Sequence, residues 1–480
     1  MFFVYQIVLY FYGVNFQKME NGSKQQLIKR IASLVSENKD LKEKLRVLTE
    51  THNQLTDEVE KHKEWLEKAK SEQVDSSKQT FQKTKYNTVT ILFVKMQGLS
   101  DMMTAANASE YMDKLDDIVL RFNEIVEKYQ LIKQQSIGDN FICAGGIPEK
   151  NITNPITLVL AALEMLSIVE TGKQNNDEHA WSLNIGIHTG SVTALVGGHN
   201  QSNYDLKGET VNVASRIGSV GRKNTALISA TTYELVKEMF DCRYTTALPV
   251  KYHNPLELFT VAGIKEEFAS DEKRRLPNDA FRTQWMLVQF SDLQELILDK
   301  LEKGLPKNLF YHNVKHTVDV VTESELIGWS EGLNDHQLLL LKTAALFHDS
   351  GHTISYADHE ERSVDIAREI LPKYHYTPEE IDEICRIIMA TKLPPKPADL
   401  LEAIICDSDL DYLGRTDFVP VSNSLYAELT AQGKSMSLND WNKLQIKFIG
   451  SHQYFTKTGR KLREVKKQEQ IDRIKLLIEN

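Results

Sequence analysis

The most regular pattern of apolar positions lies near the start of the chain, over residues 24–68. From Leu27 onward, apolar side chains recur at alternating spacings of four and three residues. This repeat of about 3.5 residues predicts a left-handed coiled coil. Asn38 occupies an a position, which favours two parallel strands because paired amides can bond to each other there. The d positions are Leu27, Leu34, Leu41, Leu48 and Leu55, and the a positions include Ile31, Leu45 and Val59. We predict a homodimer; a helix packed on its own domain is the alternative.

Residues 1–18 form an apolar leader, in which Met1 to Gln17 carry no charge. A membrane helix needs roughly 20 apolar residues, and a secretory signal needs a basic start and a cleavage site of small residues. Neither pattern is complete. We therefore expect the true start at Met19 and no membrane partner, with a short hydrophobic anchor as the alternative.

Strand and helix patterns alternate in the middle of the chain, over residues 86–264. Residues 88–95 alternate between apolar and polar like a strand, and residues 185–188 follow another apolar stretch. Helical patterns lie at about 105–129 and 155–171. This alternation predicts an α/β or α+β domain.

After residue 264, the strand patterns end and helical patterns take their place. Residues 265–282 are highly charged and lack periodicity, which is typical of a linker. Helical patterns follow and predict an all-α bundle over residues 283–480. The expected helices are about 285–303, 313–329, 334–347, 359–371, 378–391, 399–406, 438–455 and 460–478.

Composition narrows the class of protein. At 480 residues, the chain is too long for one core, and its net charge of −10 argues against nucleic acid as a partner. The four cysteines, Cys143, Cys242, Cys385 and Cys406, form no CxxC pair. This spacing fits a reducing compartment, so we expect a cytoplasmic protein.

Residue types that bind metals recur in the predicted bundle. His312 and His316 lie four apart on one helix face, and His348 and Asp349 end an apolar helix. The set continues with His352, His359 and Asp407. Imidazoles and carboxylates on facing helices suit Zn²⁺, Mn²⁺, Fe²⁺ or Mg²⁺. Such an ion makes water a better nucleophile and polarises a phosphoryl oxygen.

Four blocks of the middle domain resemble class III adenylyl and guanylyl cyclases. They are LFVKMQGLS (92–100), SIGDNF (136–141), LNIGIHTGSVTALVGG (183–198) and YDLKGETVNVASR (204–216). The resemblance implies an α+β ferredoxin-like fold and a nucleotide site with Mg²⁺ or Mn²⁺ held by two carboxylates. Asp139 matches one carboxylate, but Lys95 occupies the position of the other. An ammonium group repels Mg²⁺, and Asp101 is too far along the chain to replace the lost ligand.

The remaining cyclase residues are present by the same resemblance. Asn212 and Arg216 match the pair that orients the ribose and stabilises charge on the phosphate. Asp205 and Gln135 match the positions that read the base, and Gln135 leaves the base open because an amide both donates and accepts. Family sites form between two such domains, which agrees with a homodimer. The domain is thus a nucleotide-binding but inactive sensor, a weak cyclase or a structural remnant.

The bundle resembles the HD superfamily of phosphohydrolases, and YHNVKHTVDV (311–320) is similar to a block of cyclic nucleotide phosphodiesterases. The resemblance implies that His316, His348, Asp349 and Asp407 bind a first metal, with Asp409 as the alternative to Asp407. It assigns His312 as the general acid, and His352 and His359 to a second metal or the phosphate. No purine clamp is recognisable, so the substrate stays open.

Three interpretations follow. In the first, which we favour, a dimeric phosphohydrolase is controlled by nucleotide bound to the middle domain. In the second, the chain both makes and hydrolyses a cyclic nucleotide. In the third, it is a non-catalytic scaffold that responds to nucleotide.

Overall fold

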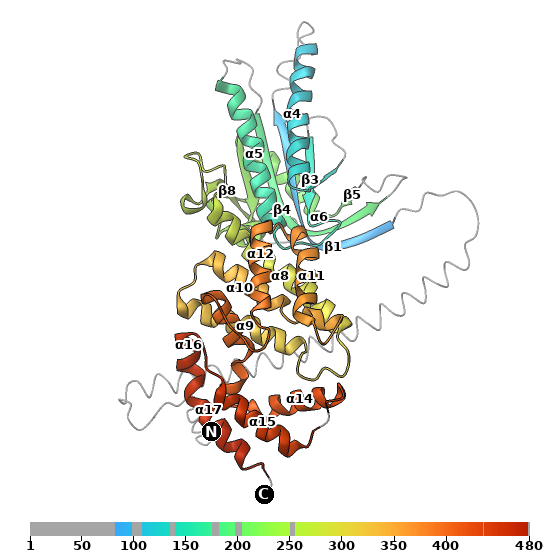
Figure 1. Ribbon diagram of the computed structural model, residues 1–480. Helices are drawn as coiled ribbons and strands as arrows, with labels where there is room; N and C mark the ends of the chain where they lie inside the picture. The colour runs from blue at the N-terminus through green and yellow to red at the C-terminus, as the bar shows by residue number, and fades with distance from the viewer. Residues whose placement is uncertain are drawn as a thin grey trace, which may run out of the picture. The chain divides into compact units, whose positions relative to one another are not determined.

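The computed structural model describes residues 82–97, 108–134, 140–174, 182–196, 204–249, 255–434 and 436–478, and residues 80–480 form one compact unit (Figure 1). The predicted leader (1–18) and coiled coil (24–68) lie outside the described residues, as do Gln135 and Asp139. No helix among the described residues is long and apolar enough to cross a bilayer.

A mixed sheet forms the first part of this unit, the sheet domain (residues 82–264). Its strands run in the order β2-β3-β1-β4-β6-β8-β7, and β5 pairs with β4. Only the β4–β6 pairing is parallel among these described pairs. The strands are β1 (Gln82–Gln97), β2 (Ile132–Gln134), β3 (Asn140–Gly145), β4 (Ser182–Val196), β5 (Tyr204–Lys207), β6 (Thr225–Ser229), β7 (Phe240–Leu248) and β8 (Leu256–Ile264).

Helices cover both faces of the sheet. They are α4 (Ala108–Lys128), α5 (Asn154–Gln174), α6 (Glu209–Val220) and α7 (Ala230–Val236). Alternation along β1 sends Leu92 and Val94 into the core with α4 and α5, and Ile91 and Phe93 into the opposite core with α6. A Cβ at Gly186 would lie 2.2 Å from a backbone atom of α6, so this glycine permits the close approach of α6 to β4.

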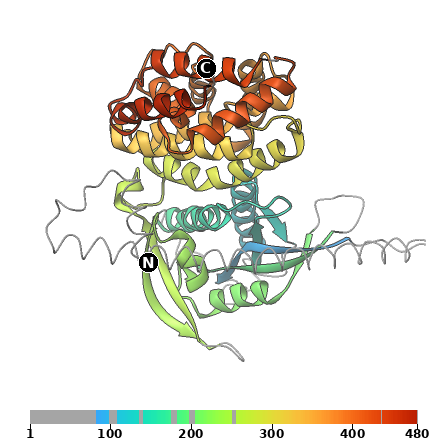
Figure 2. The ribbon, with the colours of Figure 1, turned by 90° about the horizontal axis from the view of Figure 1, so that it is seen from below.

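The second part is the helical region (residues 279–478), and Figure 2 shows its layers beside the sheet domain. A mixed-sheet domain followed by helices confirms the predicted fold class for the described residues. The α-helices are α8 (Asp279–Gly304), α9 (Val314–Glu331), α10 (Asp335–Phe347), α11 (His359–Ile370), α12 (Pro378–Met389), α13 (Leu400–Asp409), α14 (Phe418–Ala431), α15 (Leu438–Ser451), α16 (Lys457–Gly459) and α17 (Val465–Lys475). Short 3-10 turns are η2 (Glu266–Phe268), η3 (Ser350–Thr353), η4 (Leu371–Tyr374) and η5 (Asp411–Gly414), and η6 (Arg460–Glu464) is a π turn.

Two elements differ from the expected pattern. Helix α14 was not predicted, because Pro420 and the polar residues of its first turns are poor helix formers. Helix α8 begins at Asp279, inside the segment predicted as a linker. The Asn278 side chain caps it by accepting a hydrogen bond from the amide of Phe281. The sequence therefore placed the start of the helical region a few residues late.

Candidate metal centre

The first histidine of the centre is positioned by a helix cap. The Asn313 side chain accepts hydrogen bonds from the amides of Lys315 and His316 and so starts α9. His316 therefore stands in the first turn of α9, and its side chain is 9% exposed.

The turn after α10 supplies three more ligand-type side chains, His348, Asp349 and His352. The Ser363 hydroxyl of α11 donates to the carbonyl of His348 (2.6 Å) and accepts from the amide of Gly351 (2.8 Å). A Cβ at Gly351 would lie 1.9 Å from the carbonyl oxygen of α11's first residue, so only glycine fits. The turn is thereby fastened to α11.

His316, His348 and Asp409 converge from three elements, with ligand atoms all within 4.8 Å of one another. His316 Nε2 lies 3.1 Å from Asp409 Oδ1 and 3.4 Å from His348 Nε2. His348 Nδ1 lies 2.7 Å from the carbonyl of Ala345, which leaves Nε2 facing the centre. Two imidazole nitrogens and one carboxylate oxygen thus point at a common volume, which is the geometry of a divalent-ion site.

A second group lies next to the first and contains His312, Asp349 and His352. His359 joins it, because its ring stacks on that of His352 at 4.0 Å and its Nε2 lies 3.7 Å from Asp349 Oδ1. Asp349 Oδ2 faces the first group, 3.2 Å from His348 Nε2 and 3.4 Å from His316 Nε2. Within the described residues, both ring nitrogens of His352 are buried without a hydrogen-bond partner. Since buried polar atoms are rarely left unsatisfied, these donors fit a bound ion or an anionic ligand.

Asp407, the preferred sequence assignment, does not join the histidines. Its carboxylate accepts hydrogen bonds from the amides of Phe455 (2.8 Å) and Thr456 (2.8 Å) and from the Thr456 hydroxyl (2.7 Å). These donors already occupy the buried carboxylate. The structure therefore brings Asp409, the alternative, to the centre and corrects the assignment of Asp407.

His312 has a partner that sequence reasoning missed. Its Nδ1 contacts Oε1 of Glu428, a fully buried carboxylate on α14. Glu428 Oε2 also accepts from the amides of Tyr311 (2.9 Å) and His312 (3.0 Å), and the Tyr356 hydroxyl donates to Oε1 (3.2 Å). No local pattern marks Glu428, because it is 116 residues from His312 in the chain.

The electrostatics of the cluster favour positive charge. Burial would raise the pKa of Asp349, but His348 beside it holds that pKa well below its ordinary value. Burial would likewise raise the pKa of Asp409, but hydrogen bonds from His316 and His348 lower it. Burial lowers the pKa of His352 to about 3, so this imidazole is neutral at pH 7. Burial would lower the pKa of the His348 imidazole, but the carboxylates of Asp349 and Asp409 raise it well above its ordinary value, so a bound cation would replace the proton of His348.

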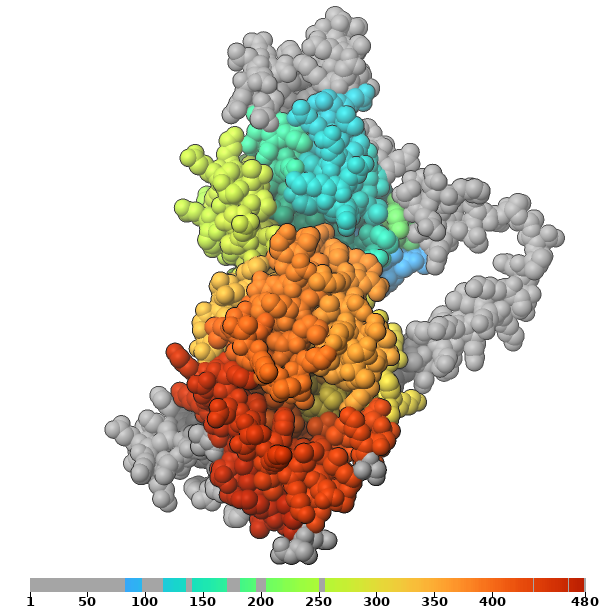
Figure 3. Space-filling model, in the orientation of Figure 1, coloured from blue at the N-terminus to red at the C-terminus, as the bar shows by residue number. Residues whose placement is uncertain are grey.

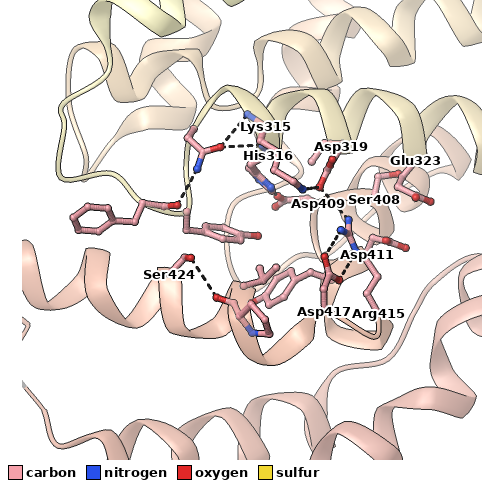
Figure 4. Close-up of a pocket in the computed structure, with 17 residues that line it drawn as sticks. Lys315, His316, Asp319, Glu323, Ser408, Asp409, Asp411, Arg415, Asp417 and Ser424 are labelled. Carbon is pink, nitrogen blue, oxygen red and sulfur yellow. Dashed lines mark hydrogen bonds and ion pairs between the residues drawn. The ribbon is translucent and has the colours of Figure 1, made fainter. Parts of the chain in front are cut away.

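A cavity of about 270 Å³ opens beside the cluster (Figure 4). His316 and Asp409 point toward one another on its wall. Arg415 lies on another side, where it binds Asp417 and Asp319 at 2.6 and 3.0 Å. The other lining residues are Phe310, Tyr311, Asn313, Lys315, Val320, Glu323, Ser408, Asp411, Tyr412, Pro420, Val421 and Ser424. The centre is therefore open to a small ligand.

The residues expected to bind nucleotide in the sheet domain are spread over three described elements. Lys95 is half-buried on β1, in register with Asn140 and Asn184. Asn212 and Arg216 are exposed on α6, and the Arg216 guanidinium donates to the carbonyl of Pro249 (2.6 Å). Asp205 on β5 is also exposed and pairs with Lys207 at 3.0 Å.

Two family models match the chain. Residues 81–263 match the adenylate and guanylate cyclase catalytic domain, and residues 313–412 match the HD domain. The chain joins a cyclase-family domain to an HD domain. These matches confirm the resemblances to the class III cyclases and to the HD superfamily. The similarity of residues 311–320 to cyclic nucleotide phosphodiesterases stays a prediction.

Individual relatives match the sheet domain. Human guanylyl cyclase C is 30% identical over 230 residues, which cover 45% of this chain and 20% of that protein. Receptor-type guanylate cyclase gcy-13 of Caenorhabditis elegans is 27% identical over 190 residues, 38% of this chain and 18% of that protein. The chain thus spans about a fifth of the length of these curated relatives. The solved guanylate cyclase domain of RhGC from Catenaria anguillulae, in complex with GTP, is 26% identical with a TM-score of 0.35 and covers 38% of this chain and 100% of that chain.

Proposed function

We propose that the HD domain is a metal-dependent phosphohydrolase acting on a nucleotide phosphoester, with cyclic nucleotides among the candidate substrates. We propose further that nucleotide bound to the cyclase-family domain controls it. The convergence of His316, His348 and Asp409 carries the proposal, since their ligand atoms face one another beside an open cavity. These three residues would hold the first divalent ion, which is Zn²⁺, Mn²⁺, Fe²⁺ or Mg²⁺. Asp349, whose Oδ2 lies 3.2 Å from His348 Nε2 and 3.4 Å from His316 Nε2, would join that first ion. His352 and His359 would hold a second ion or the phosphate.

The proposed chemistry divides between an ion and a proton donor. When bound, the ion supplies Lewis acidity, which makes water a better nucleophile and withdraws charge from a phosphoryl oxygen. Glu428 fixes the ring of His312 through Nδ1, so Nε2 is the atom that delivers a proton to the leaving oxygen. Burial would lower the pKa of His312, but the hydrogen bond to Glu428 and the nearby Asp349 raise it. Glu428 and Asp349 thus favour the protonated form of His312, which is the form that a general acid needs.

The cyclase-family domain is proposed to bind nucleotide without turnover, using Gln135, Asp205, Asn212 and Arg216, with Asp139 for a cation. Lys95 stands where a second metal ligand is expected and supplies a positive charge to the phosphates instead. In a homodimer, both copies carry Lys95, so the partner cannot restore the ligand. We place this dimer in the cytoplasm and assign the pairing to the coiled coil and the cyclase-family domains.

Metal analysis and a substrate panel test the hydrolase. We expect the purified full chain to retain a divalent ion and to hydrolyse at least one of cyclic AMP, cyclic GMP and bis(p-nitrophenyl) phosphate. The Asp409→Asn variant is expected to lose both. Asp472→Asn is the matched control, because that aspartate is 59% exposed on α17. Equal metal content and equal rates in Asp409→Asn and the control would overturn this site. A wild-type chain that retains no ion and hydrolyses none of these substrates would favour the non-catalytic scaffold.

An active cyclase is the second candidate, favoured by one observation. Asn212 and Arg216 lie four apart on the exposed face of α6, open to a partner. The test supplies ATP, GTP, CTP or UTP with Mn²⁺ and looks for a cyclic product. Wild-type protein is expected to form none, and Lys95→Asp is expected to gain activity. Cyclic product from the wild type would replace the inactive sensor with a bifunctional enzyme.

A further inference from the structure

Helix α8 (Asp279–Gly304) belongs to two hydrophobic cores. Phe281, which is 2% exposed, is part of the core under the sheet, where its ring meets that of Phe240 at 5.6 Å. Further along α8, Phe290 and Ile297 belong to the core of the helical region. Trp285, between them, packs against both cores. One unbroken helix, Asp279–Gly304, therefore contributes side chains to both cores.

Arg282, the residue after Phe281, binds the same turn of α8 to the helical region. Arg282 donates two hydrogen bonds to Glu380 on α12, at 2.7 and 2.8 Å, and a third to the carbonyl of His375 at 2.8 Å. Consecutive residues of α8 are thus held by different parts of the molecule. A rotation of this turn would break the contacts on one side or the other.

A second contact lies further along α8. The Asp292 carboxylate accepts a hydrogen bond from the amide of Ile152 in the sheet domain (2.7 Å), and Lys150 pairs with Glu295 at 3.1 Å. The space-filling view shows that the orange surface, which follows α8 in the chain, also meets the teal surface of the sheet domain (Figure 3). Together with Phe281, the contacts of Asp292 and Glu295 therefore join several turns of α8 to the sheet domain.

The far end of α8 reaches the turn that carries the metal-ligand residues. A Cβ at Gly304 would lie 3.1 Å from Cγ2 of Thr353, the last residue of η3. His352, of the second candidate group, precedes Thr353 in that turn. Leu301, one turn earlier in α8, is 1% exposed in the core of the helical region. One helix of about 39 Å, at 1.5 Å per residue, hence links the core under the sheet to the candidate metal centre.

We propose that α8 couples the two domains into one cooperative unit, so that an ion bound at the HD centre stabilises the sheet domain. Any factor by which the ion changes the affinity of the sheet domain for a nucleotide is, by linkage, the factor by which that nucleotide changes the ion affinity of the HD centre. The physical reason is that packed cores rearrange as wholes and do not deform continuously. This regulation rests on the proposed ion site, and the experiment below separates the two.

Hydrogen exchange on the full chain tests the coupling with Mn²⁺ as the probe. In a cooperative unit, the slowest amides of β6 in the sheet domain exchange only when the whole unit opens. At a Mn²⁺ concentration near 100 times its dissociation constant, we expect these amides and those of α10 to slow by the same factor of roughly 100. Protection confined to the helical region would overturn the coupling and leave the ion site intact. No protection anywhere would overturn the ion site and, with it, this inference.

Variants locate the effect. In Asp409→Asn, Mn²⁺ is expected to slow the hydrogen exchange of neither β6 nor α10. If Mn²⁺ still slowed exchange in β6 of this variant, the ion would be bound in the sheet domain, and the coupling would be overturned. Phe281→Ala is expected to remove protection from β6 while α10 keeps it. Because Phe281→Ala can unfold the sheet domain, the milder pair Lys150→Ala and Asp292→Ala is measured too and is expected to reduce the β6 effect. Leu296→Ala, at a 41% exposed position of α8, is the control.

Discussion

Asp407 and Asp409 stand two residues apart on α13 and face different neighbours. Residues two apart in a helix point to opposite sides, so only one of the two can face the histidines of α9 and the turn after α10. Asp409 Oδ1 meets His316 at 3.1 Å, whereas Asp407 takes its three hydrogen bonds from the segment before α16. Asp409 therefore faces the candidate metal centre, whereas Asp407 binds α13 to the segment before α16.

Substitution separates these two roles. Asp409→Asn is expected to weaken Mn²⁺ binding by more than about 100-fold, because a ligand is lost. Asp407→Ala is expected to lower the free energy of unfolding by about 3 kcal/mol, since it leaves buried donors at Phe455 and Thr456 without an acceptor. Urea titration and ion titration of the folded variants measure the two effects. The opposite result, with Asp407→Ala stable but unable to bind Mn²⁺, would restore Asp407 as the ligand.

At the scale of elements, the turn η3 depends on its close contact with α11. Gly351 lies where a Cβ would overlap the carbonyl oxygen of His359, and Ser363 bonds to both sides of the turn. The contact places His348, Asp349 and His352 opposite α9. The element therefore tolerates little change in backbone position.

Two glycine substitutions test this dependence. Gly351→Ala is expected to lower the free energy of unfolding by about 2 kcal/mol and to reduce the ion content, because α11 must move away. In contrast, Gly450→Ala on α15 meets nothing within 4 Å and is expected to stabilise the protein by about 0.5–1 kcal/mol. Urea unfolding and metal analysis compare the pair. Wild-type ion content and stability in Gly351→Ala would contradict the close packing of this turn.

For the whole molecule, the ion pair between Arg282 and Glu380 lies where α8 meets both cores. Burial alone would raise the pKa of Glu380, but hydrogen bonds from Arg282, Thr377 and His336 lower it from 4.5 to about 2. A folded-state pKa below the unfolded value means that the stabilisation is present above about pH 4.5. It is then lost as the pH falls toward 2 and the carboxylate becomes protonated.

Comparison with Glu380→Gln isolates this contribution from the other carboxylates. Near pH 7, the free energy of unfolding of the variant is expected to be about 2 kcal/mol lower than that of the wild type. This figure is smaller than the full pKa shift implies, because Arg282 is partly exposed and water screens the pair. The difference is expected to shrink between pH 4.5 and 2, as followed by urea unfolding at each pH. If the difference in the free energy of unfolding between the wild type and Glu380→Gln stayed constant over that interval, the ion pair with Arg282 would not be what lowers the pKa of Glu380.

Local spacing was enough to predict much of this protein. The alternation along β1 and the three-and-four spacing of the bundle helices predicted a sheet domain followed by helices, because periodicity reports which side chains share a face. The same spacing singled out His316, His348 and Asp349. The order of motifs likewise identified both families. The predicted coiled coil lies outside the described residues and stays a prediction.

Only the tertiary structure decided which carboxylate completes the centre and what orients His312. Asp407 and Asp409 sit in the same short apolar-to-acidic stretch, and the choice between them depends on which side of α13 packs against α9. Glu428 lies on α14, a helix with weak local signals, and reaches His312 across 116 residues. The periodicity of α8 also could not show that this helix belongs to two cores. An apolar position predicts that a side chain is buried, but not in which core it lies.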